Sequence, residues 1–222
     1  MTGTTPIDSQ GARVAAYAAL GVALLFAPYL WIGIIHPLIG SDAQLAASPA
    51  EARYSTLFAI ELSEIGWGGL LIVFGGGLWA VLRRAEGGAG LWSAIAFAAC
   101  VATAVTILAC TTFLAAIAHM APNLDPATLR ALYDIALVAN LSTAFPNAVY
   151  PAAAAKVILE TRVLPAWVAY GAIAVAATHL ASSMSLAPEG LWSPGGLLPS
   201  LAPITHLVWL VAIAVALLRA RS

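Results

Sequence analysis

Four ionisable side chains lie within apolar stretches of this sequence, where charge is costly. Glu61 and Glu64 are three residues apart and would share one face of a helix. His179 and His206 lie in two later stretches, at similar depths by residue count. A charge near the centre of a bilayer costs about 2–3 kcal/mol or more, so such groups usually have a function. We expect Glu64, with Glu61, to act as a general acid and the two histidines as bases or orienting groups.

A second set of residues would hold a substrate beside these groups. Polar side chains recur at helical spacing at Asn140, Thr143, Asn147 and Tyr150. We expect Asn140 and Tyr150 to bind polar parts of the substrate. Pro146 and Pro151 would interrupt this helix and free backbone carbonyls. Aromatic walls, which can stabilise a cationic intermediate, would come from Trp67, Phe145 and Trp209.

Several of these residues also have a purely structural explanation. Glu61 can extend to the membrane interface, and Asn147 can hydrogen-bond to a neighbouring helix. Each histidine can bond a backbone carbonyl in a packed core. Asp134 follows Arg130 by four residues, so a surface ion pair on one helix explains it.

The composition indicates an integral membrane protein. The chain has 222 residues, of which 62% are hydrophobic and only 9% are charged. A water-soluble domain needs more charge to cover its surface. The formal net charge of −1 argues against nucleic acid as a partner. Ten residues of helix would separate Cys100 from Cys110 by about 15 Å, too far for a disulfide between them.

The apolar stretches predict an all-α fold, in one domain over residues 1–222. Six stretches reach the roughly 20 residues that cross a bilayer. They cover residues 14–35, 55–82, 91–118, 129–155, 164–184 and 197–218. Ser48-Pro49-Ala50-Glu51 is a capping box before the second stretch, and Asp125-Pro126 opens the fourth in the same way. Glycine-rich runs at 66–69 and 75–77 would allow close packing of helices.

The positive charges predict the orientation of this bundle. One side would carry Arg13, Arg83, Arg84, Lys156, Arg162, Arg219 and Arg221, and the other side only Arg53 and Arg130. Because cytoplasmic loops carry the excess of Lys and Arg, we expect a multi-pass protein of the cell membrane with both termini in the cytoplasm.

The second and fourth predicted spans also suggest an internal repeat. Each follows a short capped start that ends in arginine, at Arg53 and Arg130, and each then contains a Leu-Ser pair, Leu62-Ser63 and Leu141-Ser142. Each is followed by a basic turn and a span that contains tryptophan. The two hairpins would then be parallel repeats with a groove between equivalent helices.

The chain resembles a broad group of uncharacterised bacterial six-span integral membrane proteins. The stretches that carry the resemblance are Ala52 to Arg84, with its acidic helix start, and Val157-Ile-Leu-Glu-Thr-Arg-Val-Leu-Pro-Ala-Trp167, which leads into a span with Gly171. The resemblance implies a six-helix fold without a defined activity. The chain is also similar in size to small integral-membrane terpene cyclases, which use intramembrane carboxylic acids to protonate an isoprenoid. That resemblance implies such a role for Glu61 and Glu64.

Taken together, these patterns favour an integral membrane enzyme. It would act by acid–base chemistry on a hydrophobic isoprenoid or lipid-like substrate, in a pocket in the outer half of the bilayer, by cyclisation or isomerisation and without a cofactor. Its other partners would be membrane lipids. A small-molecule or proton-coupled transporter is the alternative, supported by the repeat and the interrupted helix. A minor alternative is a haem or metal site on His179 and His206.

Overall fold

The structure is a computed structural model, and its regular elements are all helices. It describes residues 9–35, 58, 60–187, 190–193 and 196–220, and the following account is confined to them. The elements, in chain order, are α1 (Ser9–Ile35), the π-helix η1 (Glu64–Leu70), α4 (Leu71–Glu86), α5 (Leu91–Met120), the 3₁₀ turn η2 (Ala121–Asn123), α6 (Pro126–Leu141), α7 (Ala144–Thr161), α8 (Ala166–Ser183) and α9 (Leu197–Arg219). The all-α prediction is confirmed for these residues.

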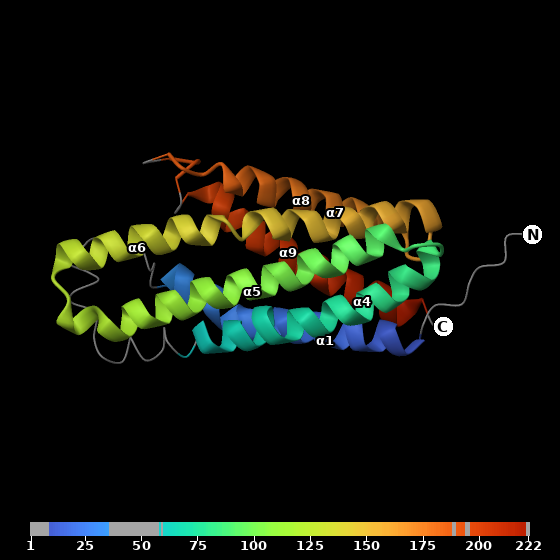
Figure 1. Cartoon of the computed structure of the whole chain (residues 1–222), viewed down its shortest axis with the longest axis horizontal. Coiled ribbons are helices and arrows are strands. Elements are labelled where there is room, and N and C mark those ends of the chain that lie inside the picture. The colour runs from blue at the N-terminus through green and yellow to red at the C-terminus, as the bar shows by residue number, and fades with distance from the viewer. Residues whose placement is uncertain (1–8, 36–57, 59, 188–189, 194–195, 221–222) are drawn as a thin grey trace, which may run out of the picture.

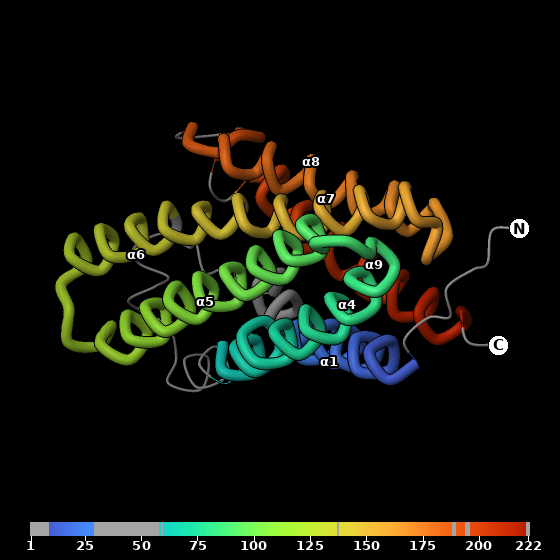
Figure 2. The backbone as a smooth tube through the Cα atoms, turned by 45° about the vertical axis from the view of Figure 1, so that its right-hand side comes forward, coloured from blue at the N-terminus to red at the C-terminus, as the bar shows by residue number. Residues whose placement is uncertain are grey.

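The long helices form a closed ring. Around it, α1 packs on α4, α4 on α5, α5 on α7, α7 on α8, α8 on α9, and α9 returns to α1 (Figures 1 and 2). Across the ring, α4 also touches α7, where the rings of Phe74 and Tyr150 lie 6.5 Å apart. Side chains from opposite sides of the ring therefore meet in the middle and form one core. The α5–α6 hairpin extends beyond this core at one end (Figure 1).

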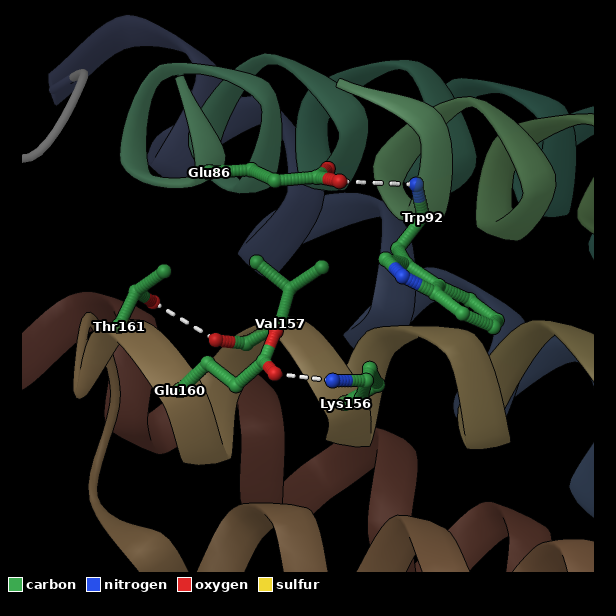
Figure 3. A network of polar contacts seen from close by, with 6 residues as sticks. All are labelled: Glu86, Trp92, Lys156, Val157, Glu160 and Thr161. Atoms are coloured by element: carbon green, nitrogen blue, oxygen red, sulfur yellow. Dashed lines mark hydrogen bonds and ion pairs between the residues drawn. The ribbon is translucent and has the colours of Figure 1, made fainter. Parts of the chain in front are cut away.

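One end of the bundle gathers the basic residues. The start of α1, the end of α9 and the α4–α5 and α7–α8 turns all lie there (Figure 1). At this end Glu86 accepts hydrogen bonds from the backbone N–H groups of Trp92 and Ser93, at 2.9 and 2.8 Å. The ammonium of Lys156 lies 5.9 Å from the centre of the Trp92 ring and pairs with Glu160 (Figure 3). These contacts fix the level of α5 relative to α7.

In the described part of the chain, four helical segments are long and apolar enough to cross a membrane. They are Ser9–Pro28, Ile60–Glu86, Leu91–Asn123 and Leu197–Arg219. The outer surface of the bundle is apolar as well: Leu24 is 73% exposed and Val208 is 65% exposed. Contiguous exposed aliphatic surface is rare in soluble monomers and normal where lipid is the solvent. The membrane assignment therefore stands on these four segments.

Glycines bring α1 and α4 unusually close together. A Cβ atom built on Gly77 would lie 2.6 Å from the backbone nitrogen of Ala15 and 2.7 Å from the carbonyl oxygen of Gly11. Because both are backbone atoms, neither can move aside without shifting α1. A Cβ on the adjacent Gly76 would meet nothing within 4 Å. Close packing thus explains the glycine at 77, as the sequence predicted for this run.

We predict opposite effects for alanine at these two neighbouring glycines. Gly77→Ala should lower the free energy of unfolding by about 1–3 kcal/mol, because the added methyl group overpacks the α1–α4 contact. Gly76→Ala should leave stability unchanged or raise it by up to about 1 kcal/mol, because alanine favours helix. Thermal unfolding of the purified protein in detergent measures both. Equal effects of the two substitutions would contradict the packing explanation.

Two helices are irregular. The second predicted span contains the π-helix η1, which begins directly after Leu62-Ser63. The fourth predicted span is divided at residues 142–143 into α6 and α7. Pro146 explains the division because it has no N–H for the carbonyl of Ser142. Pro151, in contrast, lies inside α7 without ending it, so the expected interruption occurs only at Pro146.

The two expected caps have different outcomes. Asp125 caps α6 as predicted: its carboxylate accepts from the N–H and the hydroxyl of Thr128, which holds its pKa below the usual value. The capping box at 48–51 lies outside the described residues, as does Arg53. Cys100 and Cys110 are both free, as their spacing predicted.

Candidate functional site

The two deep histidines meet at the centre of the bundle. His179 lies in the last turns of α8, and His206 lies near the middle of α9. Their separation along the chain places them at one level because α8 and α9 are antiparallel neighbours. The Nε2 atom of His179 lies 3.0 Å from Nδ1 of His206. His206 is wholly buried, and His179 is 7% exposed.

Tyr150 of α7 extends this contact into a chain of three side chains. Its hydroxyl forms a hydrogen bond with Nε2 of His206, so both ring nitrogens of His206 are engaged. Tyr150 is itself buried, with 1% of its surface exposed. Three separate helices thus each contribute one titratable group to a continuous hydrogen-bonded line, Tyr150–His206–His179.

The line has a preferred arrangement of hydrogens. With all three groups neutral, Tyr150 donates to Nε2 of His206, and Nδ1–H of His206 donates to His179. In the reverse arrangement, His206 would donate to the Tyr150 oxygen, and the hydroxyl hydrogen would need another acceptor. A proton can pass between Tyr150 and His179 if His206 gains one proton and releases another. The geometry therefore suits proton transfer.

Aromatic rings enclose His206. Trp67 of η1 lies edge-on to it, with ring centres 4.7 Å apart, and Phe26 of α1 lies edge-on to Trp67 at 5.3 Å. Trp209, one turn along α9, lies 6.1 Å from His206, and its Nε1 donates to the carbonyl oxygen of Val168 at 3.0 Å. These rings keep the imidazole away from bulk water. Trp67 and Trp209 are thus beside the histidines, as residues of one site must be.

The two glutamates take other positions. Glu61 is exposed, which agrees with a place at the interface. Glu64 is partly buried and accepts a hydrogen bond from Thr112 of α5 at 3.4 Å. The histidines and the glutamates therefore make their contacts with different partners. Acid–base cooperation between Glu64 and the histidines stays a prediction, without a contact that joins them.

Exposure falls along the predicted polar stripe toward Tyr150. Asn140 is exposed, whereas Thr143, Asn147 and Tyr150 are buried. Phe145 is 58% exposed on the outer surface, so it faces away from the ring interior. Of the expected substrate-binding residues, Trp67, Tyr150 and Trp209 surround His206, while Asn140 and Phe145 lie outside that cluster. The Asp134–Arg130 ion pair, at 3.1 Å, is present as the sequence predicted.

Sequence reasoning missed two buried hydroxyl groups, those of Thr103 and Ser185. Among the described residues, the buried side-chain atoms without a hydrogen-bond partner are Trp67 Nε1, Thr103 Oγ1, Asn147 Oδ1 and Ser185 Oγ. Ser185 follows Ser182, also buried, and both follow His179 at three-residue spacing. That spacing was visible in the sequence. Thr103 is one of several hydroxyl residues in α5, and the sequence did not indicate which of them would be buried.

The histidine pair does not have bis-axial haem geometry. A metal between two imidazoles needs a nitrogen–nitrogen distance of about 4 Å, from two bonds of about 2 Å. The facing nitrogens of His179 and His206 are 3.0 Å apart and already share a hydrogen. Among the described residues, moreover, no group of three or more His, Cys, Asp or Glu side chains could hold a metal ion. The geometry thus disfavours the haem or metal alternative.

An apolar groove lies between α8 and α9. Its volume is about 270 Å³, and its walls include Trp167, Gly171, Thr205 and Trp209. At one side Thr205 and Thr178 share a hydrogen bond of 2.9 Å. Neither the histidines nor Glu64 line it. Trp209 is therefore a common wall, with the groove on one side and the His206 cluster on the other.

Comparisons with known proteins add no relative. No protein-family model, curated protein or solved structure matches the chain. The resemblances inferred from sequence therefore stay predictions, and function has to be argued from the site itself.

We predict that Tyr150→Phe destabilises the protein. The change leaves Nε2 of a wholly buried His206 without a partner, which should lower the free energy of unfolding by about 1–3 kcal/mol. Tyr170→Phe, on the exposed face of α8, is the matched control and should change little. Thermal unfolding in detergent compares the two. If both variants unfold at the same temperature, the hydrogen bond of Tyr150 contributes nothing.

Proposed function

We propose that the chain is a proton-coupled carrier of a small molecule in the cell membrane. The observation that carries the proposal is the hydrogen-bonded line Tyr150–His206–His179, built from three helices inside an apolar bundle. Each bond of the line requires a particular protonation state of the rings. Binding or release of a proton therefore changes how α7, α8 and α9 are held together. A carrier needs such a link between proton binding and helix arrangement.

The irregular helices support a carrier. The π-helix begins directly after Leu62-Ser63, and the α6–α7 break includes Ser142, directly after Leu141. These Leu-Ser pairs are the ones that suggest the repeat. Transporters built from repeats commonly have discontinuous helices at corresponding positions around their substrate. π-Helices are also frequent at functional sites.

We infer six spans with both termini in the cytoplasm. Four spans are the long apolar segments, and the other two would be α6 with α7, and α8, which belong to the same ring. The end of the bundle that carries Arg13, Arg83, Arg84, Lys156 and Arg162 would face the cytoplasm.

With that orientation, protons would reach the line from the outer side. Buried polar residues lead outward from it on two helices, through Asn147 and Thr143 on α7 and through Ser182 and Ser185 beyond His179. Toward the basic end, aliphatic residues such as Ala154, Ile158 and Ile213 follow instead. The described arrangement would therefore be closed to the cytoplasm. Movement of α7, α8 or α9 would open the other side.

We predict proton movement that depends on the histidine line. The protein is reconstituted in liposomes with a pH-sensitive dye inside, and amino acids, sugars and nucleosides are added outside one by one. At least one compound should start an inward proton flux. His206→Gln should reduce this flux at least tenfold, because it interrupts the line at its centre. His119→Gln, on an exposed residue at the end of α5, should not change it.

Two results would count against this proposal. One is a compound-dependent proton flux that His206→Gln and Tyr150→Phe leave unchanged. The other is the absence of any compound-dependent flux together with chemical conversion of an added isoprenoid, detected by mass spectrometry.

The second result would favour an integral membrane enzyme that acts on a hydrophobic isoprenoid or lipid-like substrate. The observation that favours this second candidate is the apolar groove between α8 and α9, with Trp167 and Trp209 in its walls. Its size and lining suit a hydrocarbon chain. Glu64 does not line this groove. Unchanged conversion in Glu64→Gln would therefore exclude Glu64 as the general acid, whereas loss of conversion would place the reaction beside Glu64 and not in the groove.

A further inference from the structure

The groove between α8 and α9 is apolar, and the polar side-chain atoms of Thr205 and Trp209 in its walls are already bonded. Oγ1 of Thr205 donates to the carbonyl oxygen of Ala202 at 2.9 Å and lies 2.9 Å from the hydroxyl of Thr178. Nε1 of Trp209 donates to the carbonyl oxygen of Val168 at 3.0 Å. A polar ligand placed along these walls would lose its hydrogen bonds to water without replacement. The groove therefore suits a hydrocarbon chain.

The length of the groove matches one leaflet of a bilayer. On α8 its walls run from Trp167 to Val175, and on α9 they run from Ala212 back to Ile204. Each stretch advances by eight residues, which is about 12 Å of helix. Half of a hydrocarbon core about 30 Å thick is about 15 Å. Because Trp167 lies in the first turn of α8, at the basic end, the groove begins at that interface and ends near the middle of the membrane.

The floor of the groove is already formed, and the space above it is small. A Cβ atom built on Gly171 would lie 3.0 Å from Cδ1 of Trp209, so the missing side chain lets the indole pack closely against α8. The groove volume of about 270 Å³ is below the roughly 300–1,000 Å³ of sites that hold a whole drug-sized ligand. It therefore fits one chain of a larger molecule, the rest of which would lie outside.

Exposed arginines lie beyond the basic end of the groove. Arg162 is in the α7–α8 turn, and its guanidinium has no ion-pair or hydrogen-bond partner among the described residues. The neighbouring carboxylate of Glu160 is paired with Lys156. On α9, Arg219 follows Ala212 by seven residues, about two helical turns, and so shares its face of the helix. Basic residues at the ends of membrane spans commonly hold anionic lipid head groups.

We propose that the groove binds one acyl chain of an anionic phospholipid from the leaflet at the basic end, with the lipid phosphate beside Arg162 and Arg219. The groove opens on the outer surface of the bundle, where Val208 in its wall is 65% exposed and lipid is the solvent. The bound chain would contact both α8 and α9. It would therefore stabilise the packing of the two helices that carry His179 and His206.

The test compares two phospholipids that share their acyl chains and differ in charge. Purified protein in detergent is mixed with dioleoyl phosphatidylglycerol, which is anionic, or with dioleoyl phosphatidylcholine, which is zwitterionic, and thermal unfolding is followed. At a concentration about tenfold above its dissociation constant, phosphatidylglycerol should raise the unfolding midpoint by about 3–6 °C. Phosphatidylcholine should give less than half of that shift, because it brings no net charge to Arg162.

Two variants separate the acyl chain from the head group. Ala174→Leu fills the groove from an exposed position on α8, so the shifts with both lipids should disappear. Arg162→Gln should at least halve the phosphatidylglycerol shift and leave the phosphatidylcholine shift unchanged. The matched controls are Ala177→Leu, which is exposed on α8 outside the groove walls, and Arg84→Gln, which is exposed at the basic end on α4. Neither control should change the shifts.

Four results would overturn the proposal. The first is equal stabilisation by the two phospholipids, and the second is a phosphatidylglycerol shift that survives filling of the groove. The third is a lipid-free dimer that Ala174→Leu separates, which would show that a second copy of the chain covers the groove. The fourth is equal stabilisation by an uncharged isoprenoid alcohol that does not depend on Arg162. Should Ala174→Leu not fold, Ala212→Leu fills the groove from α9.

The lipid site does not depend on proton-coupled transport, and the two proposals can fail separately. Proton flux that needs His206, without any preference for the anionic lipid, would leave the proposed function standing and remove the lipid site. Stabilisation by phosphatidylglycerol without any flux would do the reverse.

Discussion

A polar side chain inside an apolar bundle has to find its partner within the bundle, and this constraint organises the structure. Several buried hydroxyls meet it locally. Thr111, for example, donates to the carbonyl of Ile107 one turn back on its own helix. Such bonds satisfy the side chain and leave neighbouring helices free to move. The two ring nitrogens of His206 do not bond to its own helix, α9. Their hydrogen-bond partners come from α7 and α8. That requirement sets the relative level of three helices.

The same requirement makes the centre of the bundle sensitive to protons. A neutral imidazole donates at one nitrogen and accepts at the other, so it can join two unlike partners. A protonated one can only donate, and two imidazoliums at 3.0 Å would repel strongly in a medium of low dielectric. The line can therefore hold one extra proton at most without rearrangement. The aromatic rings around the line exclude water, which would otherwise solvate the additional charge.

Sequence patterns predicted the helices well because span length and capping are local properties. Residue counting also placed His179 and His206 at one depth, and the structure shows that their rings are in contact. It did not show that Tyr150 would complete the line, because depth alone does not tell which side of a helix faces which neighbour. The separation of Glu64 from the histidines had the same cause. In an α-helix Glu64 and Trp67 would lie about 60° apart, but the wider turn of η1 separates them further. The local sequence contains no pattern that predicts the π-helical turn of η1.

The contact between α1 and α4 at Gly77 has a consequence for movement. Backbone rests against backbone there, without flexible side chains between the two helices that could yield. Sliding one helix along the other would drive Cβ atoms of neighbouring residues into the opposite main chain. The pair is thus a fixed frame, and any rearrangement has to be carried by the other side of the ring.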